Sequence, residues 1–512
     1  MRQSTRIILN SAYMYGSQGL EIVLQVFLLA FILRRVDEAA YGVFVLAMGL
    51  QYMLYAIRDA ITKGCITYGA RYWQEGNPEG INKVVSSASA VLVIPGVVAL
   101  ITLVTAAGPI SRFLNVAPEM QQTTCHILIL LGVNISVVLP LSPLVSLVSA
   151  RQRYDLVALV RGASRLLYAG MVVAAFLILR PDVLFVAVAS VLADLGRLVV
   201  LGIIAHRLVP SLRIRPRFVQ RASLSALLVF GSFLIYGGLA RIGVREAIKW
   251  FVGKTLGLSF VTFLLVAVIL MNLLKRACGT MTLVIVPVAS RYKALGDQTR
   301  LGELLVRSTR YVSLVTVPIV ASLAPAMGPL FALWLKPELA WVGPYSMVVG
   351  MCAAICLPAE AAAQIVIGMG DSKRPFVATA AGALLGLAAT ALTVGFLGWG
   401  LSGAILGICV SLVVMAIGYT WCALGQIEVR SRRLLWEAYL QPIVAAIPAA
   451  AVCTVLRYFL VLDTWPALIA ACAAAGATYV IAFLPFVTRA EWGLARRALA
   501  WRPWKPTGGD LL

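Results

Sequence analysis

The sequence predicts an all-α polytopic membrane protein with about 14 transmembrane spans. Composition is the first observation behind this prediction. Apolar residues make up 61% of the 512 residues and charged residues 12%, whereas about 25% of residues in soluble domains are charged. The second observation is a series of apolar runs, such as 84–107 and 347–367, close to the ~20 residues that cross a bilayer core. Because lipid offers backbone groups no hydrogen-bond partner, runs of this length are helices.

The apolar runs divide the chain into fourteen expected spans. These are 9–33, 41–62, 84–107, 124–149, 156–179, 183–206, 223–250, 256–274, 311–335, 341–367, 376–397, 402–424, 435–460 and 466–487. The apolar segment 277–290 either extends the eighth span or lies at the membrane interface. The connections between spans are too short to hold a soluble catalytic domain.

Lysines and arginines concentrate at alternate span ends. One set of ends carries Arg2, Arg6, Lys63, Arg71, Lys83, Arg151, Arg153, Arg207, Arg213, Arg215, Arg217, Arg221, the basic residues from Lys275 to Arg310, Lys373, Arg374, Arg430, Arg432, Arg433 and those of the C-terminal tail. The other set carries Arg34, Arg35, Arg112, Arg180, Lys254, Lys336 and Arg457. The positive-inside rule therefore predicts a multi-pass protein of the bacterial inner (cytoplasmic) membrane with both termini cytoplasmic. The same distribution assigns the net charge of +22 to loops, so we expect no nucleic-acid partner.

Cysteine and histidine provide no sign of reactive chemistry. The nine cysteines form no CxxC motif and no secreted disulfide framework, and the two histidines, His126 and His206, lie near predicted helix ends. We therefore expect no catalytic residues, no metal site and no cofactor.

A weak internal repeat divides the chain further. Residues 107–110 (Ala-Gly-Pro-Ile) recur as 327–330 (Met-Gly-Pro-Leu), and Leu-Pro at 139–140 recurs at 357–358 with nearly the same offset. Two six-helix bundles of the same orientation would place a substrate at their interface. The expected units are an N-terminal six-helix lobe at 1–215, a C-terminal six-helix lobe at 216–430, two appended transmembrane helices at 431–490 and a cytoplasmic tail at 491–512.

Several basic residues fall inside the predicted spans. Arg241, Arg245 and Lys249, spaced by four, share one helix face, and Arg161 and Arg165 form a similar pair in the fifth span. An arginine at the bilayer centre costs about 2.5–3.5 kcal/mol on insertion scales, so we expect these cations to line a polar cavity for an anionic substrate. The alternative is snorkelling with internal ion pairs.

Acidic residues inside the spans are fewer. Glu246 can pair with Lys249, but it lies about 100° round the helix from Arg245 and is poorly placed to neutralise both Arg241 and Arg245. Glu21 and Glu360 each lie on a polar stripe, which suits either proton coupling or a counter-charge for a cavity arginine.

The first eighty residues resemble the opening of polysaccharide flippases. The similarity lies in residues 31–35 (Phe-Ile-Leu-Arg-Arg), 40–44 (Ala-Tyr-Gly-Val-Phe), 63–64 (Lys-Gly) and 68–72 (Tyr-Gly-Ala-Arg-Tyr). Those flippases join their first two helices through an ARxLGPExYG stretch, in which Val-Asp-Glu at 36–38 replaces LGPE here. The resemblance covers nearly the whole chain and extends to the MOP superfamily of Wzx-type flippases, lipid II flippases and MATE drug antiporters.

This resemblance implies two MATE/MOP-like lobes and a transport function. It implies a flippase that moves a lipid-linked (undecaprenyl pyrophosphate) oligosaccharide across the inner membrane by alternating access, for surface polysaccharide or exopolysaccharide export. The implied partners are the lipid-linked oligosaccharide, membrane lipid, and the polysaccharide polymerase with other export machinery. A multidrug antiporter of the same fold is the alternative, but it would favour an acidic cavity. A membrane-embedded glycosyltransferase or polymerase would need a large outer loop rich in carboxylates, and the longest one, near 108–123, holds one acid, Glu119.

Overall fold

The computed structural model describes the backbone of residues 3–283, 285–459, 462–487 and 492. The described side chains are those of the same residues except 3–12, 230, 233–238, 240, 241 and 280–283. The side chain of Arg241 and the expected tail at 491–512, apart from Trp492, therefore lie outside the described residues.

The N-terminal half consists of six long helices. They are α1 (Gln3–Leu33), α2 (Glu38–Gln74), α3 (Pro78–Phe113), α4 (Pro118–Ala150), α5 (Tyr154–Ile178) and α6 (Val183–Leu208). Local sequence signals set their beginnings: Asp37 accepts hydrogen bonds from the Ala39 and Ala40 N–H groups at the start of α2, and α3 and α4 begin with proline. These helices confirm the first six predicted spans.

The next ten helices contain several breaks. They are α7 (Arg221–Thr255), α8 (Leu258–Ala267), α9 (Ile269–Leu283), α10 (Ile285–Ala294), α11 (Gln298–Leu323), α12 (Met327–Trp334), α13 (Gly343–Cys356), α14 (Ala359–Gly368), α15 (Lys373–Thr390) and α16 (Gly400–Leu424). Short 3-10 turns at Ala324–Ala326 and Pro337–Val342 precede α12 and α13, and a π-helical turn at Ala391–Phe396 follows α15. Pro358 lies between α13 and α14, whereas its repeat partner Pro140 lies inside the unbroken α4.

The eighth span is longer than the sequence suggested. Helices α8 and α9 meet at an angle of 44°, and α10 continues the path, so the expected end of this span at residue 274 is wrong. The bent pair extends as a candidate span to Gly279, and the rest of the apolar segment 277–290 that the structure describes lies in α9 and α10. Lys275 and Arg276, which we assigned to a loop, lie within α9 instead.

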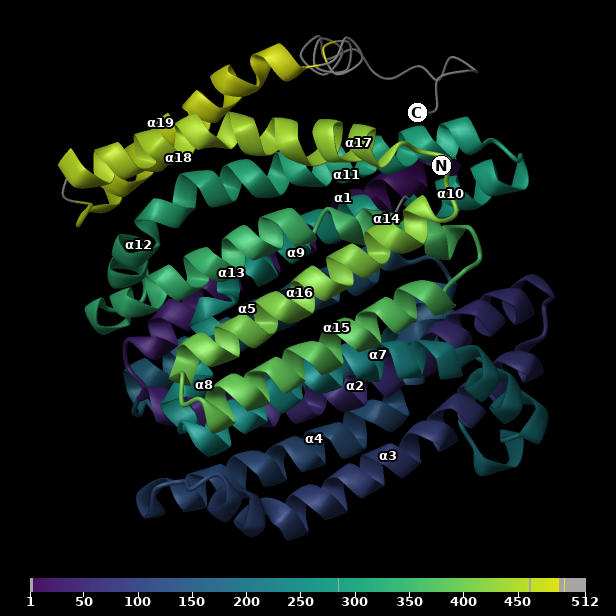
Figure 1. Cartoon of the computed structure of the whole chain (residues 1–512). Coiled ribbons are helices and arrows are strands. Elements are labelled where there is room, and N and C mark those ends of the chain that lie inside the picture. The colour runs from purple at the N-terminus through teal and green to yellow at the C-terminus, as the bar shows by residue number, and fades with distance from the viewer. Residues whose placement is uncertain (1–2, 284, 460–461, 488–491, 493–512) are drawn as a thin grey trace.

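Helices α17 (Ser431–Leu434), α18 (Gln441–Phe459) and α19 (Trp465–Phe483) complete the chain, with a π-helical turn at Leu435–Leu440 before α18 and a 3-10 turn at Leu484–Phe486 after α19. Helices α18 and α19 pack against each other and against α11, at the edge of the bundle far from α3 and α4 (Figure 1).

The helices are long and apolar enough to cross a membrane. Among the described residues twelve spans meet this test, and the bent α8–α9 pair makes a thirteenth. Helix α7, 35 residues long, packs along α2 and α15 and occupies the place of the remaining expected span. The all-helical, multi-span fold class predicted from the sequence is therefore confirmed.

The two ends of this bundle differ in charge. The basic end carries the turns at 75–77, 151–153, 209–220, 295–297, 369–372 and 425–430, which arginines and lysines flank. The opposite end carries the turns at 34–37, 114–117, 179–182, 256–257, 335–336 and 397–399. Figure 1 shows the N-terminus at the end of the bundle that also holds α10 and α17.

Helix α2 of the N-terminal half packs closely against α7 and α8 of the C-terminal half because glycines lie at both contacts. A Cβ atom on Gly42 would lie 2.1 Å from the carbonyl oxygen of Leu258 in α8, and one on Gly49 would lie 2.2 Å from the Glu246 carboxylate in α7. The Thr262 hydroxyl also donates to the carbonyl oxygen of Glu38 at 2.7 Å. Small residues at such crossings are typical of membrane helices, where close packing replaces the hydrophobic effect.

We expect Gly42→Ala to destabilise the protein because the new methyl group meets backbone, which cannot move aside as a flexible side chain can. Overpacking of this kind costs about 1–3 kcal/mol. The matched control is Gly108→Ala in α3, where a Cβ meets nothing within 4 Å; it should be neutral or slightly stabilising. Thermal unfolding of the detergent-solubilised protein measures the difference. Equal melting temperatures for the two variants would contradict the close α2–α8 crossing.

Candidate functional site

Charged side chains from both halves of the chain surround Tyr52. Tyr52 lies in the middle part of α2 with 46% of its side chain exposed. It interacts electrostatically with Arg165 of α5, Asp194 of α6, Glu246 of α7 and Arg276 of α9. We call Tyr52, these four residues and their ion-pair partners, together with Arg161 and the pair of Lys275 and Glu360, the central charge cluster. Four helices of two different halves therefore direct charge toward one region midway between the ends of the bundle.

Two ion pairs in this cluster involve the acids predicted on polar stripes. Arg165 Nε donates to Glu21 Oε1 at 3.2 Å, which joins α5 to α1. Lys275 Nζ lies 3.4 Å from Glu360 Oε1, which joins α9 to α14. Half of the Arg165 side chain and 44% of the Glu360 side chain remain exposed. Each acid has the basic partner that a counter-charge requires, although proton coupling at either acid stays a hypothesis.

Glu246 pairs with two basic side chains of α7, one more than its position on the helix suggested. Its side chain is fully buried, and Lys249 Nζ lies 2.8 Å from Oε2 while Arg245 Nε lies 3.4 Å from Oε1. We expected Glu246 to be poorly placed to neutralise both Arg241 and Arg245; it pairs with Arg245, and the Arg241 side chain lies outside the described residues. The Glu246 carboxylate lies against the Gly49 surface of α2. One carboxylate still faces two cations, and half of the Arg245 side chain is exposed.

A hydrogen-bonded network occupies the centre of the N-terminal half. Arg197 Nη2 lies 3.1 Å from Asp194 Oδ1, as expected for residues three apart. Gln51 Nε2 donates to the Tyr55 hydroxyl at 2.5 Å and approaches Asp194 Oδ2 at 3.4 Å. Asp194 thus holds α2 and α6 together at mid-bundle.

The cluster carries an excess of positive charge. Arg161 is half-buried in α5, one turn closer to the basic end than Arg165, and Arg276 is exposed in α9. Neither forms an ion pair with any residue that the structure describes. Because exposed cations at mid-membrane are costly in lipid, water or an anionic ligand must accompany them.

Sequence reasoning missed Tyr52, Lys275 and Arg276. The apolar segment 277–290 was the signal that could have revealed the two basic residues, because extending the eighth span through it places both at mid-membrane. For Tyr52 the only signal was a polar pair, Gln-Tyr at 51–52, within an otherwise apolar run.

A second cluster joins the two halves at the end of the bundle opposite the basic end. We call this cluster the latch. The Arg34 guanidinium donates to the carbonyl oxygens of Leu333 and Leu335, the Leu335 bond being 2.6 Å long, and Lys336 forms an ion pair with Glu38. These bonds satisfy carbonyl groups at the C-terminal end of α12, which its own helix leaves without partners. They hold the α1–α2 turn against the α12–α13 connection.

One more bond places the latch beside α1 itself. Trp334 Nε1 donates to the carbonyl oxygen of Val26 at 3.1 Å. The hydrogen bonds and ion pairs between the two halves concentrate at the opposite end, whereas the charge cluster lies deeper. The structure is therefore closed at the opposite end by specific polar bonds.

The structure is that of an all-helical, multi-span membrane protein. A family profile described as polysaccharide biosynthesis protein matches residues 79–335. The chain therefore belongs to the polysaccharide biosynthesis protein family.

One curated relative is the uncharacterized membrane protein EpsK of Bacillus subtilis (strain 168), 25% identical over 223 residues. The match spans 43% of this chain and 44% of EpsK, so it covers less than half of that relative.

Two solved structures share the fold. The lipid II flippase MurJ, in an inward closed conformation, is similar with a TM-score of 0.68 at 12% identity, over 96% of this chain and 100% of MurJ. An inward-facing multidrug resistance MATE family transporter of the MOP superfamily gives a TM-score of 0.65 at 16% identity, over 80% of this chain and 94% of that one. These similarities confirm the expected MATE/MOP-like fold.

We expect the latch to control access to the charge cluster from the opposite end. In a background without native cysteines, Tyr52→Cys should react slowly with a membrane-impermeant maleimide added on that side. Glu38→Lys sets two cations against each other. If this repulsion destabilises the closed state by roughly 1 kcal/mol, the rate of maleimide labelling at Tyr52→Cys should rise about fivefold. The double variant Glu38→Lys/Lys336→Glu should restore slow labelling.

Glu119→Lys is the control for this experiment, because Glu119 is exposed at the same end outside the latch. Equal labelling rates in Glu38→Lys and Glu119→Lys would rule out the latch.

Proposed function

We propose that this protein is a flippase for a lipid-linked oligosaccharide, of the undecaprenyl pyrophosphate type, in the export of a surface polysaccharide. The observation that carries this proposal is the excess of positive charge in the central charge cluster. An anionic pyrophosphate gains most from cations in a region of low dielectric constant. Membership of a polysaccharide biosynthesis family and the fold shared with a lipid II flippase support the same assignment.

The basic end faces the cytoplasm in this proposal, with both termini on the cytoplasmic side of the bacterial inner membrane. The positive-inside rule supports this orientation. The latch then closes the periplasmic side, and the charge cluster accepts substrate from the cytoplasmic leaflet.

Arginines of both lobes bind the pyrophosphate in the proposed substrate complex. Arg165 contributes from the N-terminal lobe and Arg276 from the C-terminal lobe, and a guanidinium can bind phosphate oxygens through two parallel hydrogen bonds. Arg161 guides the phosphates inward from the basic end. Arg241, Arg245 and Lys249 of α7 receive them further toward the opposite end.

Alternating access follows from this arrangement. Binding of the phosphates by both lobes replaces water between them and draws the lobes together at the basic end. Opening of the latch then exposes the cluster to the periplasmic side. Glu21 and Glu360 hold Arg165 and Lys275 in place while no substrate is bound.

A multidrug antiporter is the second candidate function. The fold shared with a MATE transporter supports it, as do Glu21, Asp194 and Glu360 at mid-membrane. An organic cation, however, would meet net positive charge in the central cluster. A membrane-embedded glycosyltransferase or polymerase is less well supported, because the turn between α3 and α4 spans only residues 114–117. Such a polymerase, with other export machinery, is instead a proposed partner.

Arg276→Ala should strongly reduce surface polysaccharide and cause lipid-linked units to accumulate in the inner leaflet. Charge-assisted hydrogen bonds contribute roughly 1.5–3 kcal/mol, so substrate affinity should fall about 10- to 100-fold. Arg165→Ala should act similarly, and Arg165→Lys should be partly active because it keeps the charge but loses the planar fork. Surface polysaccharide and the sidedness of lipid-linked units are the measurements.

The matched control is Arg430→Ala, which removes an exposed arginine from the basic end. Normal polysaccharide in the Arg165→Ala/Arg276→Ala double variant, with the protein present in the membrane, would exclude both residues from the mechanism. Efflux of cationic dyes that is lost in Glu21→Gln or Glu360→Gln would favour the antiporter.

A further inference from the structure

The segment between α6 and α7 crosses the basic end in an extended path, with one short 3-10 turn at Pro216–Phe218. Buried polar side chains of α3 hold its backbone. Asn82 donates to the carbonyl oxygen of Ser211 at 3.1 Å and accepts from the Arg213 N–H at 2.9 Å. Ser86 and Ser87 accept from the N–H groups of Arg215 and Gln220. We call residues 209–220 the strap.

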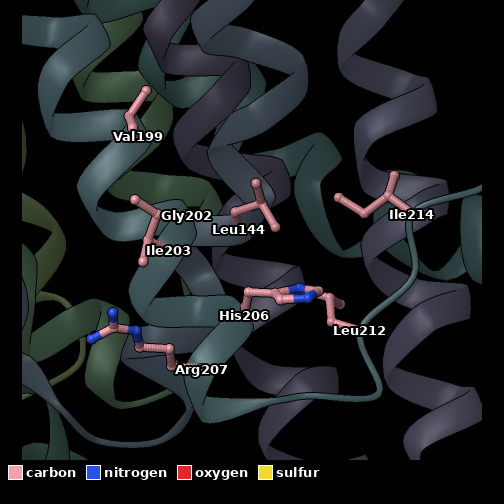
Figure 2. Close-up of a pocket in the computed structure, with 8 residues that line it drawn as sticks. All are labelled: Leu144, Val199, Gly202, Ile203, His206, Arg207, Leu212 and Ile214. Carbon is pink, nitrogen blue, oxygen red and sulfur yellow. The ribbon is translucent and has the colours of Figure 1, made fainter.

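A groove lies between the strap and helices α4 and α6. Its volume is about 640 Å³, and its walls are Leu144, Val199, Gly202, Ile203, His206, Arg207, Leu212 and Ile214. Figure 2 shows Val199, Gly202 and Ile203 along one wall, Leu144 behind them, and Ile214 on the strap across the groove. From Val199 to Arg207 the groove follows α6 for about 12 Å.

The polar groups of the groove lie at its basic end. Figure 2 shows the His206 ring pointing toward Leu212, while the Arg207 side chain lies on the same side of the view as Val199 and Ile203. Arg207, Arg213 and Arg215 are exposed, and none forms an ion pair with a residue in the described part of the chain. The sequence contains no acidic residue between Asp194 and Glu246. Among neighbouring elements, Glu79 is paired with Lys83 and Asp155 with Arg153.

We propose that this groove binds an anionic phospholipid of the surrounding membrane. The apolar wall from Val199 to Ile203 receives an acyl chain, and the phosphate binds Arg207 and Arg213 at the basic end. Basic pockets between transmembrane helices on the cytoplasmic side are typical sites for anionic lipid headgroups. The exposed Val199 and Ile203 side chains, 60% and 50% accessible, open the groove to the acyl region of the bilayer.

This site is separate from the proposed substrate site. Gly202 lies about 12 Å further along α6 than Asp194 of the central charge cluster, toward the basic end. The strap also joins the two proposed lobes, so a lipid held between the strap and α6 would limit their relative movement from the membrane side. The proposal therefore does not depend on which substrate the protein moves.

Native mass spectrometry of the delipidated, full-length protein in detergent tests the site. Phosphatidylglycerol should bind wild type at least about tenfold more tightly than phosphatidylcholine, and Arg207→Gln/Arg213→Gln should remove that preference. Arg430→Gln/Arg432→Gln is the matched control, since it removes two exposed arginines from the same end, and it should keep the preference.

A second variant tests the groove itself. A Cβ on Gly202 would lie 3.7 Å from Leu144 Cδ1, an ordinary contact, so Gly202→Leu can fold while its longer side chain fills the groove. Its affinity for phosphatidylglycerol should fall at least about fivefold.

Three results would overturn the proposal. One is equal binding of phosphatidylglycerol and phosphatidylcholine by wild type. Another is an equal loss of preference in the two arginine double variants. The third is displacement of bound phosphatidylglycerol by glycerol phosphate at concentrations similar to that of the lipid, because glycerol phosphate lacks acyl chains.

Discussion

The cost of placing charge inside a membrane governs this structure. Each ion at mid-membrane must find a partner, water or a ligand, because an unpaired arginine there costs about 2.5–3.5 kcal/mol even on lenient scales. Glu21, Asp194, Glu246 and Glu360 each have a basic partner within 3.4 Å. The pairs of Glu21 with Arg165 and of Glu360 with Lys275 join different helices, so these two interactions lower the cost of the charges and also hold helices together. In the proposed function, the surplus cations bind the anionic part of the substrate.

Close helix contact makes this arrangement possible. Gly49 lets the fully buried Glu246 carboxylate lie against α2, where its pairs with Arg245 and Lys249 are shielded from lipid. Gly42 brings the same helix against α8 near the latch. Helix α2 therefore contacts α7 and α8 of the C-terminal half at two depths, one beside the charge cluster and one near the latch.

The spans could be predicted from the sequence because hydropathy is a local property of the chain. Boundaries agreed closely for unbroken helices such as α6, expected at 183–206 and observed at Val183–Leu208. The prediction failed in the eighth span, where Lys275 and Arg276 interrupt the apolar run and were interpreted as a loop. Within a broken helix, charged residues that face a polar interior have the same local pattern as residues at a span end.

The charge cluster was harder to predict because pairing is a long-range property. The i, i+3 spacing of Asp194 and Arg197 is a signal that the sequence carries for their pair, since both partners lie on one helix. The pairs of Arg165 with Glu21 and of Lys275 with Glu360 join helices far apart in sequence. The latch depends on backbone carbonyl groups of Leu333 and Leu335, which have no signature in side-chain chemistry.

The central claim is that the cluster selects an anionic, lipid-linked headgroup. Titration of the purified wild-type protein with undecaprenyl pyrophosphate, with neutral undecaprenol and with a lipophilic cation of similar apolar size tests it most directly. We expect the pyrophosphate to bind at least about tenfold more tightly than undecaprenol, because charge-assisted hydrogen bonds add to the shared burial of the isoprenoid chain. Equal affinity for the pyrophosphate and undecaprenol, or tighter binding of the cation, would contradict the account.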